Sequence, residues 1–178
     1  ADGAAPKLEK LNVNYNKIGN EGLTALARAL ADGAAPELKE LVLNGNDFSG
    51  ADEGLRLLGQ AKHPALKDLY LSNGSFNLAA LAEGMQEGSW PSLEQLWISY
   101  NKQASDEGAE ALARALERGA MPNLKKIIAC GLNSKDCMSE AGKAAVVKAR
   151  PGVDGVSQEV RDANAKAKND EYKAADAD

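Results

Sequence analysis

The apolar residues of this chain recur in a fixed pattern about every 30 residues. Each copy has two aliphatic residues three positions apart, followed two positions later by another apolar residue. The five copies are LEKLNVNYN from Leu8, LKELVLNGN from Leu38, LKDLYLSNG from Leu66, LEQLWISYN from Leu93 and LKKIIACGL from Leu124. Alternating inward and outward positions predict a short β-strand in each copy.

A helical pattern follows each of these predicted strands. In the first copy, Leu23, Leu26, Ala27 and Leu30 have the three-and-four spacing that places side chains on one helix face. Similar segments follow the other copies, so the predicted helices are 21–30, 53–61, 77–85, 107–119 and 140–149. A degenerate sixth copy is predicted to start at Val153, with Val156 as its second anchor.

The first copy reads L-x-x-L-x-V-x-x-N-x-I-G-x-x-G-L-x-x-L-A-x-x-L from Leu8 to Leu30. This motif resembles the leucine-rich repeats of the ribonuclease-inhibitor-like class, and the resemblance covers roughly residues 1–150. It implies an α/β fold, a curved horseshoe-shaped solenoid with parallel strands inside and helices outside. We therefore expect repeats over 1–156, and a polar C-terminal tail, partly helical or disordered, over 157–178.

Asparagines stand where the chain leaves three of the predicted strands. The amides of Asn16, Asn46 and Asn101 can satisfy backbone groups in the turn and link one repeat to the next. The third and fifth copies have Gly74 and Leu132 at this position. We expect those two turns to be less regular.

The first six residues of the chain recur later in it, since residues 1–6 and residues 31–36 have the same sequence. In the family that the repeats resemble, a segment at this place in the repeat forms the loop that follows a helix. We therefore expect the chain to be the C-terminal portion of a longer protein or a processed product. The alternative is that residue 1 is the natural start after processing.

Charge and hydropathy argue against two classes of partner, nucleic acids and membranes. The 21 Lys and Arg residues against 26 Asp and Glu give a net charge of −5, which argues against a nucleic-acid surface. No run of about 18 apolar residues is present, so no membrane insertion is expected. No signal peptide is visible, and an intracellular location, cytoplasmic or organellar, is favoured.

Residues with catalytic or metal-binding chemistry are sparse. His63 is the single histidine, which argues against a zinc site or a Ser-His-Asp triad. Cys130 and Cys137 lie seven residues apart, without a C-x-x-C spacing, and are interpreted as ordinary thiols in a reducing compartment. We expect no enzyme activity, no metal and no cofactor.

The position between the second and third apolar anchors faces away from the predicted helices. Reading it across the copies gives Asn12, Val42, Tyr70, Trp97 and Ile128, so four neighbouring strands place an apolar or aromatic side chain on the concave face. Polar residues flank this column, including Glu40 and Asp68. An apolar stripe with a polar rim is typical of a protein-binding patch. The alternative is that these β-favouring residues only support one another across the sheet.

The sequence thus predicts a non-enzymatic protein–protein interaction or scaffold module, or a subunit of a multi-subunit assembly, that docks a protein partner on the concave face. The alternative is a GTPase-activating protein, because the Ran GTPase activators resemble this repeat class. Those proteins typically carry a strongly acidic C-terminal stretch, which Lys166, Lys168 and Lys173 interrupt here. Inhibition of a ribonuclease would normally need more repeats and more cysteines.

Overall fold

The computed structural model describes residues 5–101, 105–129 and 139–153 of the chain. In these ranges short strands alternate with helices. The elements are β1 (Lys10–Asn12), α1 (Asn20–Ala31), β2 (Glu40–Val42), α2 (Asp52–Gln60), β3 (Asp68–Tyr70), α3 (Leu78–Gly84), β4 (Gln95–Trp97), α4 (Asp106–Glu117), β5 (Lys126–Ile128) and α5 (Glu140–Ala149). Each matches a predicted segment, with helix ends shifted by at most two residues.

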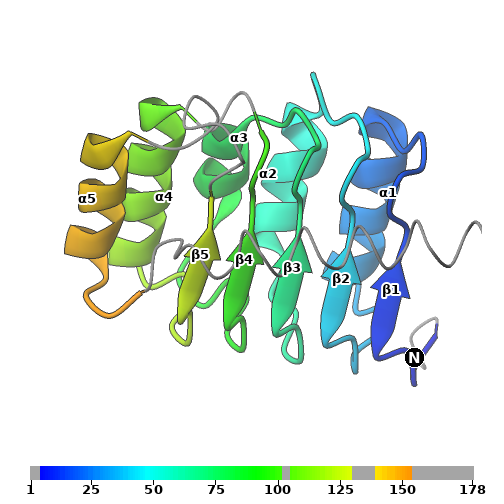
Figure 1. Ribbon diagram of the computed structural model, residues 1–178. Helices are drawn as coiled ribbons and strands as arrows, with labels where there is room; N and C mark the ends of the chain where they lie inside the picture. The colour runs from blue at the N-terminus through cyan, green and yellow to red at the C-terminus, as the bar shows by residue number, and fades with distance from the viewer. Residues whose placement is uncertain (1–4, 102–104, 130–138, 154–178) are drawn as a thin grey trace, which may run out of the picture.

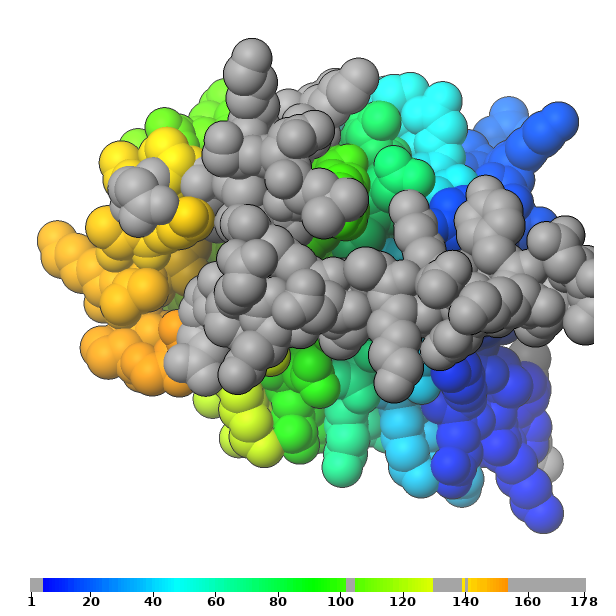
Figure 2. All heavy atoms as spheres, viewed as in Figure 1, coloured from blue at the N-terminus to red at the C-terminus, as the bar shows by residue number. Residues whose placement is uncertain are grey.

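The strands form one parallel sheet in the order β1-β2-β3-β4-β5. The helices form a second layer along one side of this sheet, in the same order as the strands (Figure 1). The packed atoms show the same progression from the blue first repeat to the orange last one (Figure 2). The predicted α/β solenoid is confirmed. We call the sheet side that faces away from the helices the helix-free face.

The core lies between the sheet and the helix layer. Equivalent strand positions pair in register, so Leu41 pairs with Leu11 on one side and with Leu69 on the other. Leu41, Leu69 and Leu96 are fully buried, whereas Leu11 in the outermost described strand is only partly buried. Each repeat therefore completes its core only when another repeat stacks against it.

The helix layer is closely packed between α2 and α3. A Cβ added at Gly84 would overlap the backbone of Arg56, and one added at Gly59 would overlap the carbonyl oxygen of Leu81. Only glycine lets the two backbones approach this closely without displacing each other. These two glycines therefore fix how near one repeat lies to the next.

Arginines satisfy carbonyl groups at the ends of two helices. Arg118 Nη2 donates to the carbonyl oxygens of Ala82 and Met85, at 3.3 and 3.1 Å, where α3 ends. Arg150 likewise donates to three carbonyl oxygens at and beyond the end of α4. Helix ends leave carbonyl groups without helical partners, and a cation there also favours the helix dipole. Each arginine thus joins its own repeat to the preceding helix.

Two of the three turn asparagines, Asn46 and Asn101, link repeats as predicted, whereas the amide of Asn16 donates within its own repeat. Asn46 is 1% exposed, and its Nδ2 donates to the carbonyl oxygens of Val13 and Leu43 at 3.0 and 2.9 Å. Its Oδ1 accepts from the backbone N–H of Ile18 in the preceding repeat, at 3.1 Å. Asn101 makes the equivalent bonds to the third repeat. The Asn16 amide donates at 2.9 Å to the carbonyl oxygens of Val13 and Asn14.

The turn of the third repeat is less regular, also as predicted. All four described turns have a positive φ at the residue before the asparagine position, namely Tyr15, Gly45, Asn73 and Tyr100. The third turn adds a second positive φ, 48° at Ser75. The missing asparagine thus coincides with a more strained backbone. The turn containing Leu132 lies outside the described residues.

Of the expected sixth copy, the structure describes the first residue, Val153. Val153 is 5% exposed and belongs to the core cluster. Its predicted partner Val156 and the predicted tail 157–178 lie outside the described residues. Within the described part of the chain, no helix has the length and apolar character needed to cross a membrane.

We predict that Asn46→Ala lowers the free energy of unfolding by about 2–4 kcal/mol, because it leaves buried backbone groups without partners. Asn16→Ala removes the equivalent side chain where its bonds are exposed, and we expect a loss below about 1 kcal/mol. Urea unfolding followed by circular dichroism measures both. Equal losses in the two variants would contradict a linking role for Asn46.

Candidate functional site

The structure lines up the predicted column on the helix-free face. The backbone pairing joins Asn12 to Val42, Val42 to Tyr70, Tyr70 to Trp97 and Trp97 to Ile128. Because strand neighbours lie about 4.8 Å apart, these side chains stand next to one another. The residue immediately before each of them belongs to the core or packs against it, namely Leu11, Leu41, Leu69, Leu96 and Ile127. The placement predicted from the repeat register is therefore observed.

Two members of this column are not accessible, which corrects the expectation of a stripe running across four strands. Val42 is 6% exposed and Ile128 is 1% exposed. Each pairs with a residue that carries a large ring, Val42 with Tyr70 and Ile128 with Trp97. Side chains directly opposite each other on one face of a sheet lie within contact distance. Asn12 is exposed, and Tyr70 and Trp97 are half-buried.

The accessible centre of the column is an aromatic pair. The Tyr70 and Trp97 rings stack with their centroids 5.2 Å apart and an interplanar angle of 23°. The pair lies on β3 and β4, in the middle of the described sheet. Stacked rings hold each other in place, so they present a preformed apolar surface at little conformational cost. We call Tyr70 and Trp97 the aromatic pair.

A polar row flanks the aromatic pair on the same face, two residues earlier in each strand. This row reads Lys10, Glu40, Asp68, Gln95 and Lys126 across the strands. Glu40 already has a cation, because Lys10 Nζ lies 2.9 Å from its Oε1. Asp68 differs: its Oδ1 is buried and has no hydrogen-bond partner among the described residues. The two predicted acidic rim residues thus have different surroundings.

The environment of Asp68 disfavours its charged form. Burial raises the pKa of this carboxyl above its ordinary value of 3.8, and the nearby charges of Glu40 and Glu94 raise it further, while Lys67 offsets this weakly. Burial, together with Asp68 and Glu40, raises the pKa of Tyr70 to about 12. The Tyr70 hydroxyl therefore stays protonated at neutral pH, beside an anion whose charge is poorly compensated.

The other polar row of this face serves the backbone, which the sequence reasoning did not anticipate. Asn14 Oδ1 accepts from the backbone N–H of Asn44 at 2.9 Å, and Asn44 Oδ1 accepts in turn from the N–H of Ser72 at 2.7 Å. The Ser99 hydroxyl donates to the carbonyl oxygen of Ile128 at 3.2 Å. Their recurrence at one repeat position was the available signal. These groups hold strand ends together.

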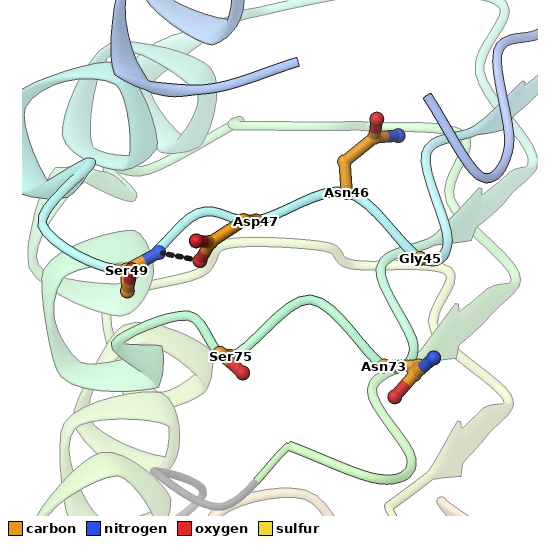
Figure 3. Close-up of a pocket in the computed structure, with 6 residues that line it drawn as sticks. All are labelled: Gly45, Asn46, Asp47, Ser49, Asn73 and Ser75. Atoms are coloured by element: carbon orange, nitrogen blue, oxygen red, sulfur yellow. Dashed lines mark hydrogen bonds between the residues drawn. The ribbon is translucent and has the colours of Figure 1, made fainter. Parts of the chain in front are cut away.

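A shallow polar pocket lies at the turns that follow β2 and β3 (Figure 3). Its lining is Gly45, Asn46, Asp47, Ser49, Asn73 and Ser75. Asp47 Oδ1 accepts from the backbone N–H of Ser49 at 3.0 Å, and the hydrogen bonds to Ser49 lower the pKa of this carboxyl. Asn46 is occupied by the turn contacts described above. The pocket thus has one carboxylate, which already serves its own turn.

Of the other residues considered for chemistry, His63 lies in the described part of the chain. His63 is 3% exposed, and its Nε2 lies 2.8 Å from the carbonyl oxygen of Ala35 in the preceding loop. Cys130 and Cys137 lie outside the described residues. Within residues 5–101, 105–129 and 139–153, no three His, Cys, Asp or Glu side chains are grouped closely enough to hold a metal ion.

The beginning of the chain is similar to a known protein family. A family model described as Leucine Rich repeat matches residues 4–27, the first strand–helix unit. The matched unit recurs structurally along the sheet. These findings support a leucine-rich repeat protein. A search of curated proteins found no match. The leucine-rich repeat itself suggests binding to other proteins.

The raised pKa of Asp68 predicts a pH-dependent stability effect. Ionised Asp68 costs stability, so its contribution is favourable below the unfolded pKa near 3.8 and is lost as pH rises through the higher folded pKa. Asp68→Asn should therefore raise the urea midpoint at pH 7 and lose this advantage at pH 3. The prediction fails if the variant is less stable than the parent chain at pH 7.

Proposed function

We propose that this leucine-rich repeat chain is a protein–protein interaction module and that its partner docks on the helix-free face. The observation that supports this most is the stacked aromatic pair, half-buried at the centre of the sheet, with Asp68 two residues earlier in β3 and Glu40 opposite Asp68 on β2. An aromatic centre with a polar rim is the usual anatomy of a protein interface. Aromatic residues also contribute most to binding energy in such interfaces.

The apolar area of the aromatic pair limits the binding free energy that the pair can contribute. Full burial of both rings would remove roughly 400 Å² from water, a gross gain on the order of 10 kcal/mol. Stacking already covers part of each ring, so about half of that gain is left for a partner. Association itself costs several kcal/mol. The aromatic pair therefore anchors a complex whose stability also needs the polar rim.

The finer assignments belong to the same proposal. We place the repeats in the ribonuclease-inhibitor-like class, over 1–156, with a polar tail over 157–178. We propose a scaffold role without enzyme activity, as a subunit of a larger assembly. The docking function is preferred to GTPase activation because the aromatic pair is a feature of the described residues that directly favours binding.

Removal of the aromatic pair tests this function. We predict that Tyr70→Ser with Trp97→Ser reduces partner capture from an extract of the source cells at least about tenfold, because the apolar anchor is lost. Capture is measured by size-exclusion chromatography of the full chain with identification of the co-migrating protein. Circular dichroism and urea unfolding establish that the variant is folded.

The matched control changes two exposed apolar residues elsewhere. Tyr15 and Val147 are 57% and 47% exposed, and Val147 lies on α5 in the helix layer. The double variant Tyr15→Ser with Val147→Ser should capture the partner as the parent chain does. Loss of capture in this control alone, with the aromatic variant unaffected, would place the docking surface elsewhere.

A further inference from the structure

The helix-free face carries one anion whose charge is not matched. Asp68 Oδ1 is buried without a hydrogen-bond partner, and in the part of the chain that the structure describes no cation lies within ion-pair distance of this carboxylate. A buried oxygen without a partner costs the fold its desolvation energy. Such a cost is offset when a bound group brings the missing donor.

The neighbouring acids show that this is specific to Asp68. Glu40 is paired with Lys10 at 2.9 Å, and Glu94 is paired with Lys125 at 2.7 Å. Both acids nevertheless add to the negative potential at Asp68, as the raised pKa of its carboxyl shows. Lys67 offsets this potential only weakly. The position therefore attracts a further positive charge.

The aromatic pair beside Asp68 determines which kind of cationic group fits this position best. Asp68 and Tyr70 lie two residues apart in β3 and so share a face, and Trp97 stacks on Tyr70 from β4. A cation is attracted to an aromatic ring face, most strongly to that of tryptophan. A guanidinium group is planar, stacks on rings and donates to a carboxylate with two parallel N–H groups. An ammonium group matches only the charge.

We propose that the partner inserts an arginine side chain of an extended basic segment between Asp68 and the aromatic pair. This inference rests on the proposed docking function and specifies its partner chemistry. The guanidinium lies against the exposed part of Trp97 and donates to the Asp68 carboxylate, whose side chain rotates on binding to bring Oδ1, buried in the free chain, to the partner. The segment's other cations are attracted by the negative potential to which Glu40 and Glu94 contribute, although each of these acids keeps its own lysine. The anionic net charge of −5 favours the approach of such a segment.

The test uses a defined probe with the full chain. The probe is a short glycine–serine peptide, blocked at both ends, with one central arginine, and the matched peptide carries citrulline, its neutral counterpart. Binding is followed by the NMR resonance of the Trp97 indole N–H. We expect the arginine peptide to bind with a dissociation constant on the order of 1 mM. The citrulline peptide should bind at least about tenfold more weakly.

Two variants separate the local carboxylate from overall charge. Asp68→Asn should weaken the arginine peptide about tenfold, although the same change stabilises the fold at pH 7. Glu110→Gln removes one negative charge from α4 on the helix side and should change affinity less than about twofold. Equal binding of both peptides, or equal effects of both variants, would overturn the proposal.

Two further outcomes separate the arginine proposal from the docking function on which it rests. If Asp68→Asn captures the cellular partner as well as the parent chain does, while loss of the aromatic pair abolishes capture, docking stands and the arginine is wrong. If Lys166→Gln with Lys168→Gln shifts the Trp97 resonance and tightens the arginine peptide, the occupant is this chain's own C-terminal segment. Either result overturns the assignment to a partner's arginine.

Discussion

The structure depends on the stacking of repeats in strict register, because no single strand–helix unit can bury its own apolar side. Leu11, Leu41 and Leu69 occupy the same repeat position and pair directly across the sheet. The buried amide of Asn46 and the guanidinium of Arg150 each bond to the preceding repeat. Packing and hydrogen bonding thus enforce the same alignment, and the alignment carries over to the opposite face.

Register on the core side fixes what the helix-free face displays. Since side chains alternate along a strand, aligned leucines require the residues between them to be aligned as well. Tyr70 and Trp97 therefore stack, and Asp68 lies beside them at one side of the pair. The face gains a rigid aromatic centre but holds a carboxylate in surroundings that disfavour its charge. The indole Nε1 of Trp97 is likewise buried without a hydrogen-bond partner among the described residues, so the stability cost is concentrated at the aromatic pair and its acid, as is typical of a functional position.

Much of this could be read from the sequence, because repeat position encodes the local environment. The strands, the helices, the linking role of Asn46 and the irregular third turn all follow from comparing equivalent positions. The burial of Val42 and Ile128 could not be predicted from the sequence, since it depends on how the side chains around each position are arranged in three dimensions. The same holds for Asp68, whose sequence environment resembles that of Glu40 although only Glu40 is paired. Side-chain conformation decides both.

The most direct test of this account is the quenching of tryptophan fluorescence by ions of opposite charge. Trp90 is fully buried, so quenching reports on Trp97. At matched ionic strength, and relative to free N-acetyltryptophanamide, we expect caesium to quench Trp97 more effectively than iodide does, with the difference reduced in Asp68→Asn. Quenching by iodide that equals or exceeds that by caesium would contradict an accessible aromatic pair in an anionic setting.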